Sequence, residues 1–168
     1  MSRRELTKSP DMRKRSEAGF SLIELLIVVA VILIIAAIAI PNYIQTKMRA
    51  NEASAAQSCR NIVTAELVYS STYGIDYSTN LSQLSGSGIN PDPNNAGLID
   101  SVLASGVKQG YAIVYTSLTT DAQGHTATYS VTADPITTST GQRHFYSDQT
   151  GVIRSNGSVQ AGPNDLPL

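Results

Sequence analysis

The chain has 168 residues, of which 12 are basic and 13 acidic, and its formal net charge is −1. This length fits a single domain. The near-neutral charge excludes the broad basic surface typical of nucleic-acid-binding proteins, so no nucleic acid partner is expected. A framework of internal disulfides is also excluded, because the chain has one cysteine.

Residues 1–19 form a basic leader. Positive charge ahead of an apolar segment predicts that the leader lies in the cytoplasm and that the rest of the chain is exported. Without the leader, six basic minus ten acidic residues leave a net charge of −4. The basic side chains of the leader are Arg3, Arg4, Lys8, Arg13, Lys14 and Arg15.

An apolar segment follows the leader. Residues 25–40 are sixteen consecutive apolar residues, and residues 20–40 are interrupted only by Ser21 and Glu24. A helix of this length, at about 1.5 Å per residue, covers the roughly 30 Å hydrocarbon core of a bilayer. The sequence therefore predicts one membrane-spanning helix over residues 20–41.

Two other interpretations of this segment remain open. A secretory signal with an A-x-A cleavage site would use Ala37-Ile38-Ala39, but the apolar run is longer than such signals and Pro41 follows directly. An uncleaved anchor on a periplasmic enzyme or binding module explains the length. It leaves Gly19 and Glu24 without a role.

Glu24 is the feature that separates these interpretations. A carboxylate inside an apolar helix costs about 2.5 to 3.5 kcal/mol near the bilayer centre and usually has a function. Cleavage after Gly19 would give Phe20 a free amine, and Phe20 and Glu24 are four residues apart on one helix face. The first turn of the helix also favours a negative charge. The alternative is a carboxylate that reaches the headgroup region.

Residues 19–26, Gly-Phe-Ser-Leu-Ile-Glu-Leu-Leu, resemble the prepilin motif of type IV pilins and of type II secretion pseudopilins. The resemblance implies that a prepilin peptidase cleaves between Gly19 and Phe20 and methylates the new Phe20 amine. These two residues would be substrate and not catalyst. By the same resemblance, Glu24 neutralises the Phe20 amine of a neighbouring subunit and sets the axial register of a filament.

Pro41 lies at the end of the apolar segment. Proline has no N–H for the carbonyl of Ala37 and disfavours helical geometry at Ile40, so a kink is expected. The resemblance implies further that residues 36–41 lose helical structure in the assembled fibre. A static bend at the membrane exit is the alternative.

Residues 42–72 contain no Gly or Pro, and Ala56, Cys59, Val63 and Leu67 recur at helical spacing. This pattern predicts an amphipathic helix that ends near Gly74. Cys59 is expected to be a small buried hydrophobic residue, with an intermolecular disulfide or a reactive thiol as the alternative. Four charged residues are expected to lie largely off the stripe, namely Arg49, Glu52, Arg60 and Glu66.

Residues 73–110 are rich in Ser, Asn, Gly and Pro and are expected to form a surface loop, variable in pilins, with a short helix over residues 96–104. Alternating β-branched and aromatic residues then predict strands in residues 111–168. The expected strands cover residues 111–116, 126–133, 142–147 and 152–154. The expected fold class is α+β, the pilin fold, with the long helix packed on an antiparallel sheet of three to four strands.

No residue pattern predicts a catalytic or metal site, so neither an enzyme nor a cofactor is expected. His125 and His144 do not match zinc spacing. The major pseudopilins often carry calcium, but Asp134, Asp148 and Asp165 are too dispersed in the sequence to predict that site.

The sequence therefore predicts a structural subunit of a bacterial type IV pilus, used for adhesion, motility or DNA uptake. It would be a single-pass inner-membrane protein in contact with lipid before assembly and part of an extracellular filament of identical copies afterwards. Expected partners are the prepilin peptidase and an inner-membrane assembly platform with its ATPase. The alternative within the family is a pseudopilin of a periplasmic pseudopilus.

Overall fold

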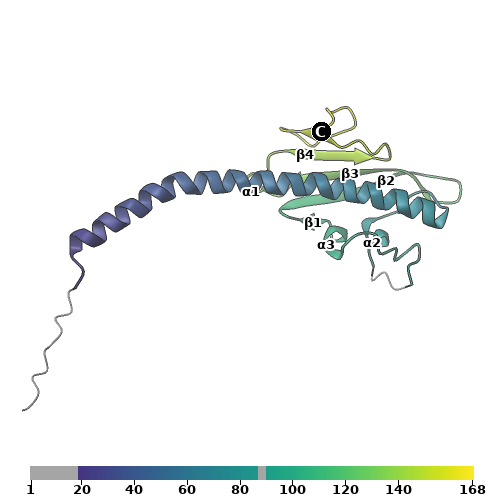
Figure 1. Ribbon diagram of the computed structural model, residues 1–168. Helices are drawn as coiled ribbons and strands as arrows, with labels where there is room; N and C mark the ends of the chain where they lie inside the picture. The colour runs from purple at the N-terminus through teal and green to yellow at the C-terminus, as the bar shows by residue number, and fades with distance from the viewer. Residues whose placement is uncertain (1–18, 87–89) are drawn as a thin grey trace, which may run out of the picture. The chain divides into compact units, whose positions relative to one another are not determined.

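The computed structural model describes residues 19–86 and 90–168, so the leader predicted over residues 1–19 lies almost wholly outside the described residues. The chain forms two compact units that divide after Ile40. The elements in chain order are α1 Leu22–Tyr73, α2 Leu81–Leu84, α3 Ser101–Ala104, β1 Val107–Lys108, β2 Tyr111–Thr120, β3 Thr126–Pro135, β4 His144–Asp148 and β5 Arg154–Asn156 (Figure 1).

Helix α1 contains both predicted helical segments, and Pro41 lies within it. The helix ends at Tyr73, where Gly74 has a φ of 66° and donates its N–H to the carbonyl of Ser70 at 3.0 Å. A left-handed residue just after a helix is the usual place for glycine. The stop signal predicted at Gly74 is therefore confirmed.

After Pro41, α1 lies along the sheet (Figure 1), and the core forms between them. Of the predicted stripe, Ala56, Cys59 and Val63 are buried, but Leu67 is 58% exposed. Glu66 is fully buried instead, so the expectation that it lies off the apolar stripe was wrong. The buried face of the helix includes Ile62, Glu66 and Tyr69, and Ser78 contacts this face by donating its N–H to Glu66 at 3.0 Å.

The sheet has five antiparallel strands in the order β1-β2-β3-β4-β5, so the prediction of three to four strands was wrong. The additional strand is β1, whose Val107 and Lys108 pair with Ala112 and Tyr111. Gln109 and Gly110 join β1 to β2, and both have positive φ, of 49° and 76°. This two-residue turn matches the twist of a tight hairpin. The sequence did not predict β1, because a strand of two residues is too short to show an alternating pattern.

Both edge strands of the sheet are short. β1 has two residues, and β5 has three. Beyond β5, the chain returns along the outer side of this strand. Arg154 forms a bridge with Pro167, and Ser155 donates its N–H to the carbonyl of Leu166 at 3.1 Å.

Residues 73–86 and 90–110 form the segment between α1 and the sheet and contain two short helices. The helix predicted over residues 96–104 begins only at Ser101. The preceding residues are not helical, because Ala96, Leu98 and Ile99 donate their N–H groups to carbonyls of Gln83 and Leu84. Asp100 then caps α3 by accepting a hydrogen bond from the Leu103 N–H at 2.8 Å.

Cys59 is fully buried on α1, as predicted, and burial raises the pKa of its thiol to about 12. Because the thiolate is the reactive form, we expect iodoacetamide to leave Cys59 unmodified in the folded chain and to modify it after unfolding in urea. Mass spectrometry of the labelled chain measures this directly. Equal labelling rates in both states would show that the thiol is accessible.

Candidate functional site

The chain just before α1 is non-helical and exposed. Gly19 has no other heavy atom within 4 Å of the place where a side chain would begin, and Phe20 is 85% exposed. A peptidase needs its target bond outside a regular helix and open to solvent. The Gly19–Phe20 bond of the described structure meets both conditions.

The first turn of α1 is capped by Glu24. The Ser21 N–H donates to Glu24 Oε2 at 2.8 Å, and the Leu25 N–H donates to the Ser21 carbonyl at 3.2 Å. Ser21 thus occupies the N-cap position and Glu24 the third helical position, as in a capping box. The Ser-x-x-Glu pattern is visible in the sequence, but the roles predicted for Glu24 did not include this hydrogen bond to Ser21.

In the described structure the Phe20 nitrogen is part of the peptide bond to Gly19, so the pairing predicted between Glu24 and a free Phe20 amine stays a prediction. The structure brings Glu24 together with Ser21, and both side chains are exposed in the single copy. The carboxylate is therefore held at the start of the helix while one of its oxygens, Oε1, makes no hydrogen bond with the described residues.

The apolar part of α1 has no cover in the single chain. Of residues 22–40, only Ala36 is even half-buried, and the large side chains range from Val29 at 46% exposure to Leu22 at 81%. Within the described residues, α1 is the one helix long and apolar enough to cross a membrane. An apolar surface of this extent requires lipid or other protein to cover it.

A buried acidic group lies in the unit formed by residues 41–168. Glu66 accepts hydrogen bonds from the Ser78 N–H at 3.0 Å and from the Ser78 hydroxyl at 2.5 Å, and Tyr115 donates to the Ser78 carbonyl at 2.7 Å. Glu66 therefore ties α1 to the segment that follows it and, through Ser78, to β2.

Burial raises the pKa of Glu66, while hydrogen bonds from Ser78 oppose that rise. The Ser78 hydroxyl also lies 3.2 Å from the carbonyl of Asn80. A protonated Glu66 can donate to the Ser78 oxygen, which then donates to Asn80, so every buried group has a partner. The network is suited to hold a helix and a loop together.

The two histidines are held by carboxylates. His144 Nδ1 lies 2.6 Å from Asp134 Oδ1, and His125 Nδ1 lies 3.0 Å from Asp121 Oδ2. The second Asp134 oxygen accepts a hydrogen bond from Gln160. Among residues 19–86 and 90–168, no three His, Cys, Asp or Glu side chains come close enough together to hold a metal ion.

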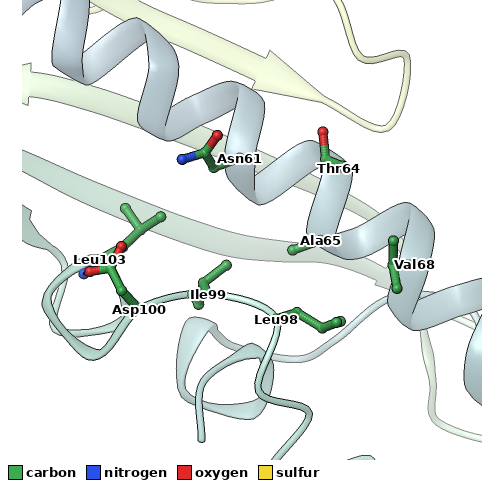
Figure 2. Close-up of a pocket in the computed structure, with 8 residues that line it drawn as sticks. All are labelled: Asn61, Thr64, Ala65, Val68, Leu98, Ile99, Asp100 and Leu103. Carbon is green, nitrogen blue, oxygen red and sulfur yellow. The ribbon is translucent and has the colours of Figure 1, made fainter. Parts of the chain in front are cut away.

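An open hollow of about 310 Å³ lies between α1 and residues 98–103 (Figure 2). Figure 2 shows Ala65 and Val68 of α1 across from Leu98 and Ile99, with Asp100 at the side. The Asp100 carboxylate is already engaged by Lys108 at 2.9 Å. The hollow therefore offers apolar contact and no free reactive group.

Comparison with known proteins gives one family match and two similar proteins. Residues 14–40 match the family described as the prokaryotic N-terminal methylation motif. The type IV wide pilus major component PilA4 of Thermus thermophilus is 39% identical over 88 residues, which are 48% of this chain and 61% of that protein. The type IV major pilin protein PilA of Myxococcus xanthus is 50% identical over 48 residues, which are 29% of this chain and 22% of that protein. The chain spans less than two thirds of each relative.

Proposed function

We propose that this chain, which carries the prokaryotic N-terminal methylation motif and is similar to type IV major pilins, is a structural subunit of a type IV pilus. The observation that carries the proposal is the matched motif at the head of a long, uncovered apolar helix. A filament in which the apolar segments of many copies pack together would cover this surface, as lipid does before assembly.

In this proposal a prepilin peptidase cleaves the exposed Gly19–Phe20 bond and methylates the Phe20 amine. The basic leader stays in the cytoplasm, and the helix holds the subunit in the inner membrane until assembly. An inner-membrane platform and its ATPase then move the subunit into an extracellular fibre. Adhesion, motility and DNA uptake are proposed as properties of that fibre.

Glu24 is proposed to set the register between neighbouring subunits. In the single copy one of its oxygens caps Ser21, and the other is available to the Phe20 amine of an adjacent copy. An unpaired amine in an apolar filament core would be costly, whereas a hydrogen-bonded ion pair approaches neutrality. Pro41 is proposed to let residues 36–41 lose helical structure in the fibre, since its missing N–H weakens the helix at that point.

The pseudopilin alternative receives less support than the pilus. Both relatives carry the word pilin or pilus in their names, and the longer match extends well beyond the motif. An uncleaved anchor on an enzyme would leave the matched motif without a role.

The mass of the mature N-terminus tests this function. We expect the protein purified from the cells that make it to begin at Phe20 with a methylated amine. We also expect shearing of those cells to release fibres that contain it. A protein that keeps its leader, or one cut after Ala39, would contradict the proposal, and methylated protein without sheared fibres would favour a pseudopilin.

A further inference from the structure

Three arginines surround a second hollow, of about 480 Å³, in the unit formed by residues 41–168. Arg49 and Arg60 come from α1, and Arg143 precedes β4, where its guanidinium lies 5.8 Å from the centre of the Phe145 ring. We call this the arginine hollow. All three side chains are exposed, so the charges surround an accessible site.

The cationic groups of the arginine hollow lack acidic partners in their own copy. Within the described residues, no carboxylate oxygen lies within 4 Å of the guanidinium nitrogens of these arginines. Glu52 also lines the hollow, but its Oε1 accepts hydrogen bonds from the backbone N–H groups of Gln142 and Arg143, at 3.0 and 3.3 Å. The hollow therefore keeps an excess of positive charge, which favours a carboxylate ligand.

Asp76 is the matching anionic group. It is exposed, and it alone among the acidic side chains of residues 41–86 and 90–168 makes no hydrogen bond or ion pair with the described residues. Each of the others accepts at least one hydrogen bond, and these are Glu52, Glu66, Asp92, Asp100, Asp121, Asp134, Asp148 and Asp165.

Asp76 and the arginine hollow lie at opposite ends of the unit. Arg60 is thirteen residues before the end of α1 at Tyr73, which corresponds to about 20 Å of helix. The sheet gives the same separation. Tyr77, which follows Asp76, pairs with Thr126 at the start of β3. Phe145, two residues after Arg143, pairs with Ala133 near the other end of β3. Seven residues of strand span about 23 Å. The two groups therefore cannot meet within one copy.

We infer that the arginine hollow of one copy binds Asp76 of another copy, so that the two ends of the domain join head to tail. This inference rests on the proposed function and adds a second contact surface to it. A head-to-tail contact uses two different surfaces and repeats without closing, which generates an open helical filament. The opposite charges also orient copies as they approach. This contact sets the position of neighbouring exported domains relative to one another, while Glu24 sets the register of the membrane segments.

Charge reversal in the full chain tests this contact. Asp76→Arg and Arg60→Glu are each expected to reduce the fibre sheared from cells by about threefold or more. An exposed ion pair strengthens a contact by up to about fivefold, and each variant replaces the pair at positions 60 and 76 by two like charges. The double variant restores opposite charges at positions 60 and 76 while Arg49 and Arg143 remain, and it is expected to yield at least about twofold more fibre than Asp76→Arg alone. Gln149→Arg is the control, since Gln149 is exposed and lies outside the hollow and away from Asp76 in sequence.

The measurements are the mass of sheared fibre, the amount of the chain in the membrane and the methylation of Phe20. The inference is overturned if wild-type cells yield fibres with methylated Phe20 while either single reversal assembles normally, or if the double variant stays as defective as the single ones. If wild-type cells yield no fibres, the proposed function itself is wrong. If inorganic phosphate binds to the arginine hollow and the charge-reversal variants assemble normally, the hollow is an anion site and not a contact between copies.

Discussion

Replacing Glu24 with alanine is expected to abolish fibre formation and to leave the chain inserted in the membrane. The carboxylate is the one acid in an apolar segment, and its loss would bury the Phe20 amine of a neighbouring copy without a counter-charge. Removing one partner of a buried ion pair costs about 3 to 5 kcal/mol, which is more than a hundredfold in each subunit contact. Sheared fibre and membrane-bound chain, measured in the same cells, show the two effects separately.

Glu24→Gln distinguishes the charge from the cap. Glutamine keeps an oxygen that can accept the Ser21 N–H, so the start of α1 is retained, but it cannot neutralise an amine. We expect this variant to be cleaved and methylated at Phe20 and to form few or no fibres. Wild-type fibre yield from the glutamine variant would show that Glu24 acts as a helix cap and not as a charge partner.

Glu66→Ala is expected to produce a large loss of stability in the unit formed by residues 41–168. The change leaves the buried Ser78 N–H without its acceptor, which costs about 1 to 3 kcal/mol, whereas the Ser78 hydroxyl keeps the Asn80 carbonyl at 3.2 Å. We therefore expect a decrease of about 2 to 3 kcal/mol in the free energy of unfolding. Urea unfolding of the full chain in detergent, followed by tyrosine fluorescence, measures it.

Glu52→Ala is the matched control for that experiment. Glu52 is the same residue type on the same helix and also accepts backbone N–H groups, but its contacts are open to water. Exposed groups regain hydrogen bonds from solvent, so the expected cost is about 1 kcal/mol or less. Equal decreases in the free energy of unfolding of both variants would show that burial does not increase the contribution of Glu66 to stability.

The pH dependence of Glu66→Gln follows from the direction of the pKa shift. Burial raises the pKa of Glu66 in the folded state above its usual 4.5, so the folded protein favours the protonated carboxyl. The contribution of this group to stability is present below pH 4.5 and is lost as the pH rises through the raised folded value. Glutamine cannot ionise. The stability of the variant relative to the wild type is therefore expected to rise between pH 4.5 and pH 7.

The features predicted from the sequence are those with long or strict patterns. Sixteen consecutive apolar residues fix the first part of α1, and β2 and β3 appear where β-branched and aromatic residues alternate. The missed elements depend on few residues. β1 has two residues, and the expected helix over residues 96–104 is shortened because long-range backbone hydrogen bonds keep its first part out of a helix.

The error at Glu66 has a different physical origin. A helical pattern assigns charged residues to solvent, which is correct for Arg49 and Arg60 on the same helix. It cannot show that Ser78, twelve residues later, folds back to donate two hydrogen bonds. The capping role of Glu24 was within reach, because Ser21 and Glu24 have the spacing of a capping box.

The short outer strands of the sheet have a consequence for how copies associate. A long unpaired strand invites uncontrolled stacking of backbones between molecules. Here β1 pairs only with the first two residues of β2, Tyr111 and Ala112, and at the other margin the chain folds back beside Arg154 and Ser155. The chain that folds back beside β5 thereby occupies backbone groups of this margin, so contacts between copies at this place are left to side chains.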